Sequence, residues 1–493
     1  MTNRPLTNVD IAWRRMEDPA NMMMITGVMV FATPLDFTRL QELISQRLLC
    51  FKGFQQVATR RNTAGGVYYW ADDPDFDLNY HLQRLELDAP GDQLKLQELV
   101  SRMMSTQLDL RRPLWQFHLV DGYQGGSVLI ARLHHCIADG IELMQVLLSL
   151  TTEDPDTFPP PPPEPEILPD GGESARSFAR MRRAYRQAKQ ASSRLAQSGI
   201  GMLAHPEQAL DLAQLGAGSL AALGRLLLLP PDPQTILKGS LDVAKLAAWS
   251  APVSLEDIKL VGKITGGTVN DVLLTAVTGA LRRYLLDHSQ QVSHLNLRAV
   301  VPVNLRPIEL DVDLGNRFGL VFLSLPVGVA DPLERLHESK RRMDALKGTP
   351  EAMVAFGILY LMGMVPIEIQ DIITFIFQTK ATAVMTNVPG PREKRYLAGA
   401  LLDSVMFWVP QAGHLGLGIS IMSYAGRVWL GVASDEGLIP DPQAIAAAFE
   451  QEFAHLYTLA TRMTAESPHQ KMQAMAAMID DAISTLDEIL SDS

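Results

Sequence analysis

The sequence predicts an α/β protein with two domains. With 493 residues, the chain is longer than one ordinary hydrophobic core can serve, so two domains are the default expectation. Short apolar runs typical of strands alternate with longer stretches whose apolar residues recur at helical spacing, before and after a proline-rich break. The pattern predicts a first domain at 1–153, a linker and basic helical segment at 154–240, and a second domain at 241–493.

The first domain is predicted from alternating elements. Strands are expected at Thr26–Phe31, Gly66–Trp70, Phe117–Val120 and Ser127–Leu133. Apolar residues at helical spacing predict helices over Phe37–Leu49 and Ile141–Leu150. A linker follows at Asp154–Glu173, and its five consecutive prolines, Pro159–Pro163, are expected to be extended and semi-rigid because such a run has no core to join.

The second domain repeats this texture. Helices are expected at Asp257–Ile264, Asn270–Leu286 (capped by Thr268), Pro442–Thr461 and Met472–Leu490. Strands are expected at Leu297–Val303, Phe318–Val327 and Ala381–Val388, with a hairpin formed by Ile419–Tyr424 and Val428–Val432. No repeat between the two halves can be aligned.

The longest apolar run, Ala352–Val365, is 14 residues long. A membrane-spanning helix needs about 20 such residues, so this run is not expected to span. Together with Ile372–Phe377 it predicts either a buried helix or an interfacial surface, and the sequence leaves both open.

Composition excludes some functions. Hydrophobic residues make up 47% of the chain and charged residues 20%, which suits a protein with an internal apolar tunnel. The net charge of −12 argues against a general nucleic-acid binder, which needs a basic surface. Two cysteines, Cys50 and Cys136, form no disulfide framework and suit a reducing compartment.

The most informative stretch, His134–Gly140, reads HHCIADG at the end of a predicted strand. Successive strand side chains alternate between faces, so one imidazole can enter a cavity only if the other enters the scaffold. A metal site is not expected, because no cluster of Cys or His follows at zinc-like spacing. Cys136 is expected to be a small apolar filler.

This stretch fits the HHxxxDG motif of the CoA-dependent acyltransferase superfamily. Within it, the chain resembles the bacterial wax ester synthase/diacylglycerol acyltransferase family from about Asn8 to about Thr461. The further matches stand in the expected order: Pro113-Leu114-Trp115 for the PLW motif, Asn270-Asp271 for the ND motif, Val301–Arg306, and Asn387–Pro391. One such motif would be weak, but five in order are specific.

The resemblance implies two chloramphenicol-acetyltransferase-like domains with the active-site tunnel at their interface. It implies transfer of a fatty acyl group from acyl-CoA to a long-chain alcohol or to diacylglycerol, with acyl-CoA as a substrate and no cofactor. The family pattern makes His135 the general base, which then protonates the departing thiolate without a covalent intermediate. No Gly-x-Ser-x-Gly nucleophile elbow competes for the role.

The other motif residues receive supporting roles. His134 is expected to be structural, Asp139 to hold the motif loop by pairing with an arginine (Arg306 is the candidate), and Gly140 to keep the tunnel wide. Asn270, beside Asp271, is either a donor to the oxyanion or a helix-cap or packing residue, and both readings stay open. Pro113, Leu114 and Trp115 are expected to be architectural, with Trp115 filling the domain interface, and Asn387–Pro391 to form a rigid loop beside the tunnel.

The expected location is cytoplasmic, since the N-terminus lacks the features of a signal peptide, with the inner membrane face or lipid droplets as peripheral sites. The segment Arg176–Arg194 carries seven basic residues. It is either a solvated helix face or a surface that attracts anionic lipid or the phosphates of CoA, and we favour lipid.

The sequence disfavours two rival functions. A non-catalytic acyl-lipid-binding or lipid-droplet surface protein is disfavoured by the intact His135, Asp139 and Gly140. A condensation-type acyltransferase is disfavoured by the PLW and ND matches and by the absence of a carrier domain.

Overall fold

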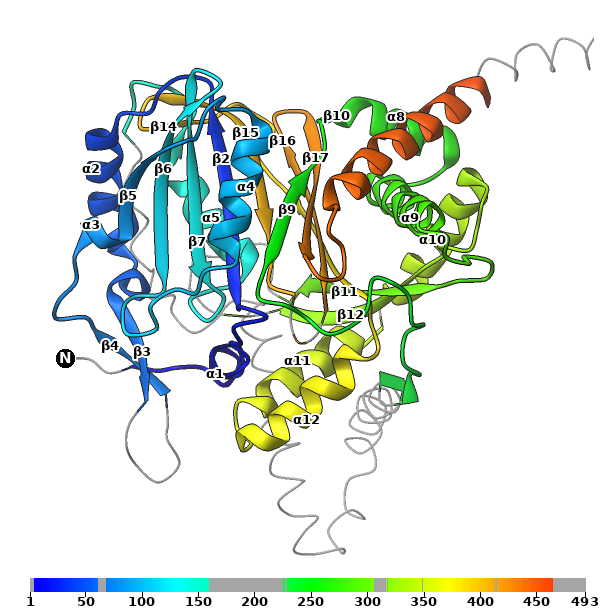
Figure 1. Ribbon diagram of the computed structural model, residues 1–493, viewed down its shortest axis with the longest axis horizontal. Helices are drawn as coiled ribbons and strands as arrows, with labels where there is room; N and C mark the ends of the chain where they lie inside the picture. Colours follow the sequence, from blue (N-terminus) through cyan, green and yellow to red (C-terminus); the bar gives the residue numbers. More distant parts are fainter. Residues whose placement is uncertain are drawn as a thin grey trace, which may run out of the picture.

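A computed structural model describes residues 4–60, 68–158, 225–226, 228–305, 316, 318–347, 349–411, 413 and 415–463. The predicted linker Pro159–Pro163, the basic segment Arg176–Arg194, and the helix predicted at Met472–Leu490 lie outside these residues. Within them, the strands form two seven-stranded sheets and one three-stranded sheet. The two large sheets stand side by side, and most helices cover their outer faces (Figure 1).

The first large sheet has the strand order β5-β6-β7-β2-β15-β14-β8. Its strands are β5 (Leu82–Glu86), β6 (Trp115–Tyr123), β7 (Gly126–His134), β2 (Met24–Phe31), β15 (Ala400–Trp408), β14 (Tyr396–Leu397) and β8 (Thr151–Thr152). The accompanying helices are α2 (Phe37–Arg47), α3 (Leu78–His81), α4 (Gln93–Met104) and α5 (Gly140–Ser149). Strand β7 pairs with β6 on one side and with β2 on the other, and every one of its residues is buried. A small sheet of β1 (Arg4–Pro5), β4 (Tyr68–Asp72) and β3 (Gln56–Arg60) lies beside it.

The second large sheet has the order β10-β17-β16-β13-β11-β12, with β9 also paired to β17. Its strands are β9 (Lys245–Trp249), β10 (Val253–Ser254), β11 (Leu297–Asn304), β12 (Phe318–Leu325), β13 (Ala383–Pro389), β16 (Leu417–Tyr424) and β17 (Arg427–Asp435). The helices α8 (Leu255–Thr265), α9 (Val269–Asp287) and α10 (Pro332–Leu346) and a closing helix at 442–463 lie outside it (Figure 1). The predicted mixed α/β class is confirmed.

The cap of α9 and the last hairpin follow from local chemistry. The Thr268 hydroxyl accepts from the backbone N–H of Asp271, whose carboxylate accepts from the backbone N–H of Thr268 in return. The turn between β16 and β17 consists of Ala425 and Gly426, both with positive φ, which matches the twist of a two-residue hairpin.

The two sheets exchange a segment. Strands β14 and β15 come from the second half of the chain but belong to the first sheet, where Val405 of β15 lies opposite Met29 of β2. The predicted boundary at 241 therefore does not separate the two sheets completely. An apolar strand pattern carries no signal for the sheet that the strand joins, so the sequence could not reveal this exchange.

A helical hairpin of α11 (Glu351–Met362) and α12 (Ile367–Gln378) lies below both sheets (Figure 1). The sequence left this region open between a buried helix and an interfacial surface. In the structure, one face of the hairpin lines a cavity, while Ile372 and Phe375 on the other face are 60% and 62% exposed. No helix among the described residues is both long enough and apolar enough to cross a bilayer.

Candidate active site

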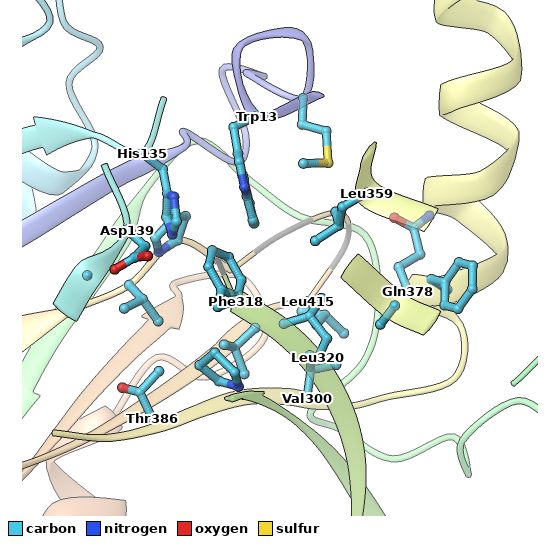
Figure 2. A pocket seen from close by; sticks show the side chains of 18 of the residues that line it. Trp13, His135, Asp139, Val300, Phe318, Leu320, Leu359, Gln378, Thr386 and Leu415 are labelled. Atoms are coloured by element: carbon cyan, nitrogen blue, oxygen red, sulfur yellow. The ribbon is translucent and has the colours of Figure 1, made fainter. Parts of the chain in front are cut away.

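A large cavity lies where the two halves meet the helical hairpin (Figure 2). It encloses about 1330 Å³, part of which is open to solvent, and its wall is mostly apolar. The first half contributes Trp13, Met16, His135, Asp139 and Gly140; the second contributes residues of β11, β12, β13 and β15, of the hairpin and of adjoining loops. The first half therefore brings the imidazole and a carboxylate to a wall that is largely built by the second.

His135 follows the last residue of β7, and its side chain lies on the cavity wall. Its backbone N–H donates to the carbonyl of Met23 at 2.7 Å, which extends the pairing of β7 with β2 by one residue. Its ring stacks on Trp13 with 4.3 Å between centroids and 18° between planes, and lies 5.5 Å from the ring of Phe318. Trp13 and Phe318 also contact each other, with 5.9 Å between centroids, so the imidazole belongs to a cluster of three rings and is only 5% exposed.

His134 points away from the cavity, as strand alternation predicts. Its Nδ1 accepts from the backbone N–H of Cys136 at 3.0 Å, and its Nε2 lies 3.3 Å from a carboxylate oxygen of Glu17. Because Nδ1 accepts, Nε2 is the ring nitrogen that carries a proton toward Glu17. That carboxylate also accepts from the backbone N–H of Met23 at 2.6 Å, so His134 and Glu17 fix the chain on both sides of the β2–β7 pair.

Burial sets the protonation states at the site. It lowers the pKa of His135 to about 4, although the negative charge of Asp139 and the Asn316 side chain act in the opposite direction. His135 is therefore neutral at pH 7 and able to accept a proton. Burial raises the pKa of the Cys136 thiol, so that sulfur is not a thiolate.

Asp139 and Gly140 begin the helix that follows the motif. A carboxylate oxygen of Asp139 accepts from the backbone N–H of Glu142 at 3.1 Å, which caps α5. Its predicted partner, Arg306, lies outside the described residues. A methyl group on Gly140 would lie 3.7 Å from Val409 Cγ1, an ordinary contact, and it would take up space in the cavity wall.

Asn270 and Asp271 differ in role. Asp271 is fully buried and completes the cap of α9. The side-chain oxygen Oδ1 of Asn270 accepts a hydrogen bond from the side-chain amide of Asn387 at 2.9 Å. Of the described residues, Asn387 and Val388 at the end of β13 line the cavity and Asn270 does not, which favours the packing reading for Asn270.

The PLW segment is architectural, but its place differs from the prediction. Trp115 donates from its indole N–H to the carbonyl of Phe54 at 2.8 Å, stacks on His81 and contacts Phe117. All of these residues belong to the first half, so Trp115 fills that domain's core rather than the domain interface. The expectation was wrong because a tryptophan beside a buried strand packs equally well in either place. The carbonyl of Leu114 accepts from the backbone N–H of His134 at 2.9 Å, which ties this segment to the motif.

The sequence missed several residues around His135. Trp13 lies on α1 (Asn8–Arg15), far from the motif in sequence. The Asn316 amide donates to the His135 carbonyl and to an Asp10 carboxylate oxygen, both at 2.8 Å. No short motif marks these residues, because the contacts join segments more than 100 residues apart.

Two solved structures share this architecture. The wax ester synthase/diacylglycerol acyltransferase from Marinobacter aquaeolei VT8 matches with a TM-score of 0.66 at 22% identity, over 93% of this chain and 100% of that one. The starter condensation domain of rhizomide synthetase matches with a TM-score of 0.56 at 12% identity, over 93% and 95% of the two chains. The fold is therefore that of the two-domain acyltransferase and condensation-domain class.

Sequence comparison is more specific. The family model described as the wax ester synthase/diacylglycerol acyltransferase catalytic domain matches residues 6–273, and the C-terminal domain of the same family matches residues 314–457. In Mycobacterium tuberculosis, the probable diacylglycerol O-acyltransferase tgs1 is 27% identical over 85% of this chain and 88% of its own length. The probable diacylglycerol O-acyltransferase tgs2 is 28% identical over 89% and 96%. The chain belongs to the wax ester synthase/diacylglycerol acyltransferase family and is an acyltransferase.

Proposed function

We propose that this enzyme transfers a fatty acyl group from acyl-CoA to the hydroxyl of a long-chain alcohol or of diacylglycerol, with His135 as the general base. The observation that carries the proposal is the neutral imidazole of His135 on the wall of an apolar cavity shared by both halves. Relatives named diacylglycerol O-acyltransferases and the match to a wax ester synthase support these two acceptors.

The chemistry needs a base because an alcohol is a poor nucleophile at neutral pH. A positioned base that removes the hydroxyl proton as the C–O bond forms is worth on the order of 10²–10⁴ in rate. His135 accepts that proton, and the negative charge of Asp139 favours the imidazolium that results. When the C–S bond breaks, the imidazolium returns the proton to the sulfur of CoA. The base is regenerated and no covalent enzyme intermediate forms.

The test is a product assay on the purified protein. Palmitoyl-CoA is incubated with hexadecanol or dipalmitoylglycerol, free thiol is followed, and the lipid product is identified by mass spectrometry. We expect a wax ester, a triacylglycerol or both, and about 10²–10⁴-fold slower product formation by His135→Ala. Release of no CoA with either acceptor would favour a non-catalytic acyl-lipid-binding protein.

We further propose that the helical hairpin rests on an uncharged lipid surface, from which the acceptor enters. Its outward apolar side chains are Met353, Leu361, Met364, Ile367, Ile369, Ile372, Phe375 and Ile376. Other residues of the same helices, among them Leu359 and Phe377, line the cavity. The hairpin would therefore lie between the cavity and the lipid surface. Between Glu351 and Gln378 the sequence has three acidic residues and no Lys or Arg, which favours apolar contact over attraction to anionic lipid.

Flotation with a phosphatidylcholine-coated triolein emulsion tests this placement. The variant Ile372→Asp/Phe375→Asp should lose most binding. The control Leu260→Asp, at an exposed apolar residue on α8 outside the hairpin, should retain it. Binding should also survive 0.5 M salt, since apolar contact is not screened. Binding that requires anionic lipid and disappears in salt would instead favour the basic segment Arg176–Arg194, and unchanged binding of the double variant would refute the hairpin as the docking element.

A further inference from the structure

We propose that Trp13 is a catalytic residue whose indole N–H stabilises the negative oxygen of the tetrahedral intermediate. The inference rests on the acyl transfer proposed above and adds the group that binds the oxyanion. The observation behind it is the buried Nε1 of Trp13, beside His135, which has no hydrogen-bond partner among the described residues.

The Trp13 side chain is almost completely buried, yet its N–H donor is unused. The residue is 4% exposed and lines the cavity, and its Nε1 has no hydrogen-bond partner in the part of the chain that the structure describes. Buried indole N–H groups usually have an acceptor, because an unpaired buried donor destabilises the fold. A substrate oxygen in the cavity would supply that acceptor.

Donor and base lie next to each other. The indole of Trp13 and the imidazole of His135 are stacked with 4.3 Å between centroids, and both face the cavity beside Phe318 (Figure 2). A hydroxyl bound to the imidazole lies about 2.8 Å from its nitrogen. The thioester carbon that it attacks lies about 3–3.5 Å further on. Because the indole is stacked on that imidazole, its N–H is the donor that we propose for the carbonyl oxygen of the thioester.

The position of Trp13 is fixed by the contacts that also fix the base. Asp10, on the same helix, accepts from the Asn316 amide, which also donates to the carbonyl of His135. On the other side, the Gln370 amide donates to the carbonyl of Ala12 at 2.9 Å. The helix is thus held to both the base and the hairpin, and the donor needs little reorganisation when charge develops.

The step balances without another reactant. As the alcohol oxygen bonds to the thioester carbon, the C=O π electrons move onto the carbonyl oxygen, and the indole N–H donates a hydrogen bond to it. When the C=O bond re-forms, the C–S bond breaks and the sulfur takes the proton held by His135. The indole keeps its proton throughout.

Trp13→Phe tests this role because it keeps an aromatic ring against His135 and removes the N–H. We expect kcat to fall on the order of 10²–10³-fold with KM for palmitoyl-CoA changed less than about threefold. Trp408→Phe is the matched control: its Nε1 is also buried without a partner among the described residues, but its side chain contacts Trp249 and, within those residues, does not line the cavity. This variant should keep kcat within about twofold.

A second variant covers a packing defect in Trp13→Phe. Incorporation of 3-benzothienylalanine at position 13 keeps the bicyclic ring and replaces only the N–H by sulfur, and it should show the same loss of kcat. Normal kcat in this variant, with active wild-type enzyme, would overturn the role of Trp13 and leave His135 as the base. Inactive wild-type enzyme with both acceptors would overturn the proposed function itself.

Discussion

His134 and His135 are neighbours in sequence and opposites in environment. His135 lies against Trp13 and Phe318 on the wall of an apolar cavity, whereas His134 faces the Glu17 carboxylate inside the scaffold. The strand places them on opposite faces, and the surroundings then give identical side chains different tasks. One imidazole is kept neutral and lies on the cavity wall, while the other holds the chain that carries it.

The largest expected effect is the loss of the cavity-facing imidazole. His135→Ala should reduce kcat about 10²–10⁴-fold, because it removes the base that we propose for the hydroxyl proton. The thermal midpoint should change much less than the rate. Thiol release and differential scanning calorimetry on the same preparation measure both, and a variant with at least a tenth of the wild-type kcat would remove His135 from the mechanism.

The pH profile sharpens the contrast between the buried imidazole and an ordinary one. Burial lowers the pKa of His135 to about 4, so the acid limb of kcat/KM should fall near pH 4 instead of near pH 6.5. The sign follows from the role: activity is lost as pH falls, since a protonated ring cannot accept a proton. At pH 4.5 this displacement retains roughly 10²-fold more activity than a pKa of 6.5 would allow. A limb near pH 6.5 would show that water enters the site and restores the ordinary pKa.

How far the sequence predicts this site depends on distance along the chain. The HHCIADG stretch, its strand and its helix are local, and the structure has β7 and α5 within a residue or two of the predicted bounds. The partners of His135 are not local. Trp13 and Asn316 reach it only because α1 and the chain before β12 fold onto the end of β7.

Distance along the chain also explains why the partners of β15 and Trp115 were not predicted. The pattern of β15 marks it as a strand, yet pairing with β2 depends on a contact across more than 350 residues. Trp115 lies in the core of the first domain and not at the predicted interface, since the sequence of a buried tryptophan does not indicate which core it fills. Periodicity predicts the elements, while their partners follow from the packing of the whole chain.

Glu17→Gln tests the supporting half of the comparison. Burial raises the pKa of Glu17, but His134, the Met23 backbone and Gln107 outweigh burial and hold it below its ordinary value. A carboxyl whose folded-state pKa is depressed adds stability above its unfolded pKa of 4.5, and this is lost as pH falls through the lower folded value. The variant should lose about 1–3 kcal/mol at pH 7, and the gap to wild type should shrink below pH 4.5. Urea unfolding at pH 7 and pH 4 measures both, and a gap that grows in acid would contradict this assignment.

The smallest expected effect concerns Cys136, which directly follows the two histidines. A nucleophilic cysteine would need a thiolate, but burial raises the pKa of this thiol, and its backbone N–H is already used to orient His134. Cys136→Ala should therefore keep kcat within about twofold and lower stability by about 1 kcal/mol through the lost packing volume. The matched variant Cys50→Ala, at an exposed cysteine, should change neither quantity. If Cys136→Ala lost activity as completely as His135→Ala, and acyl-enzyme were trapped at Cys136 in the wild type, acyl transfer would run through a thioester on the enzyme, and the neutral imidazole of His135 would serve to activate that thiol instead of the alcohol.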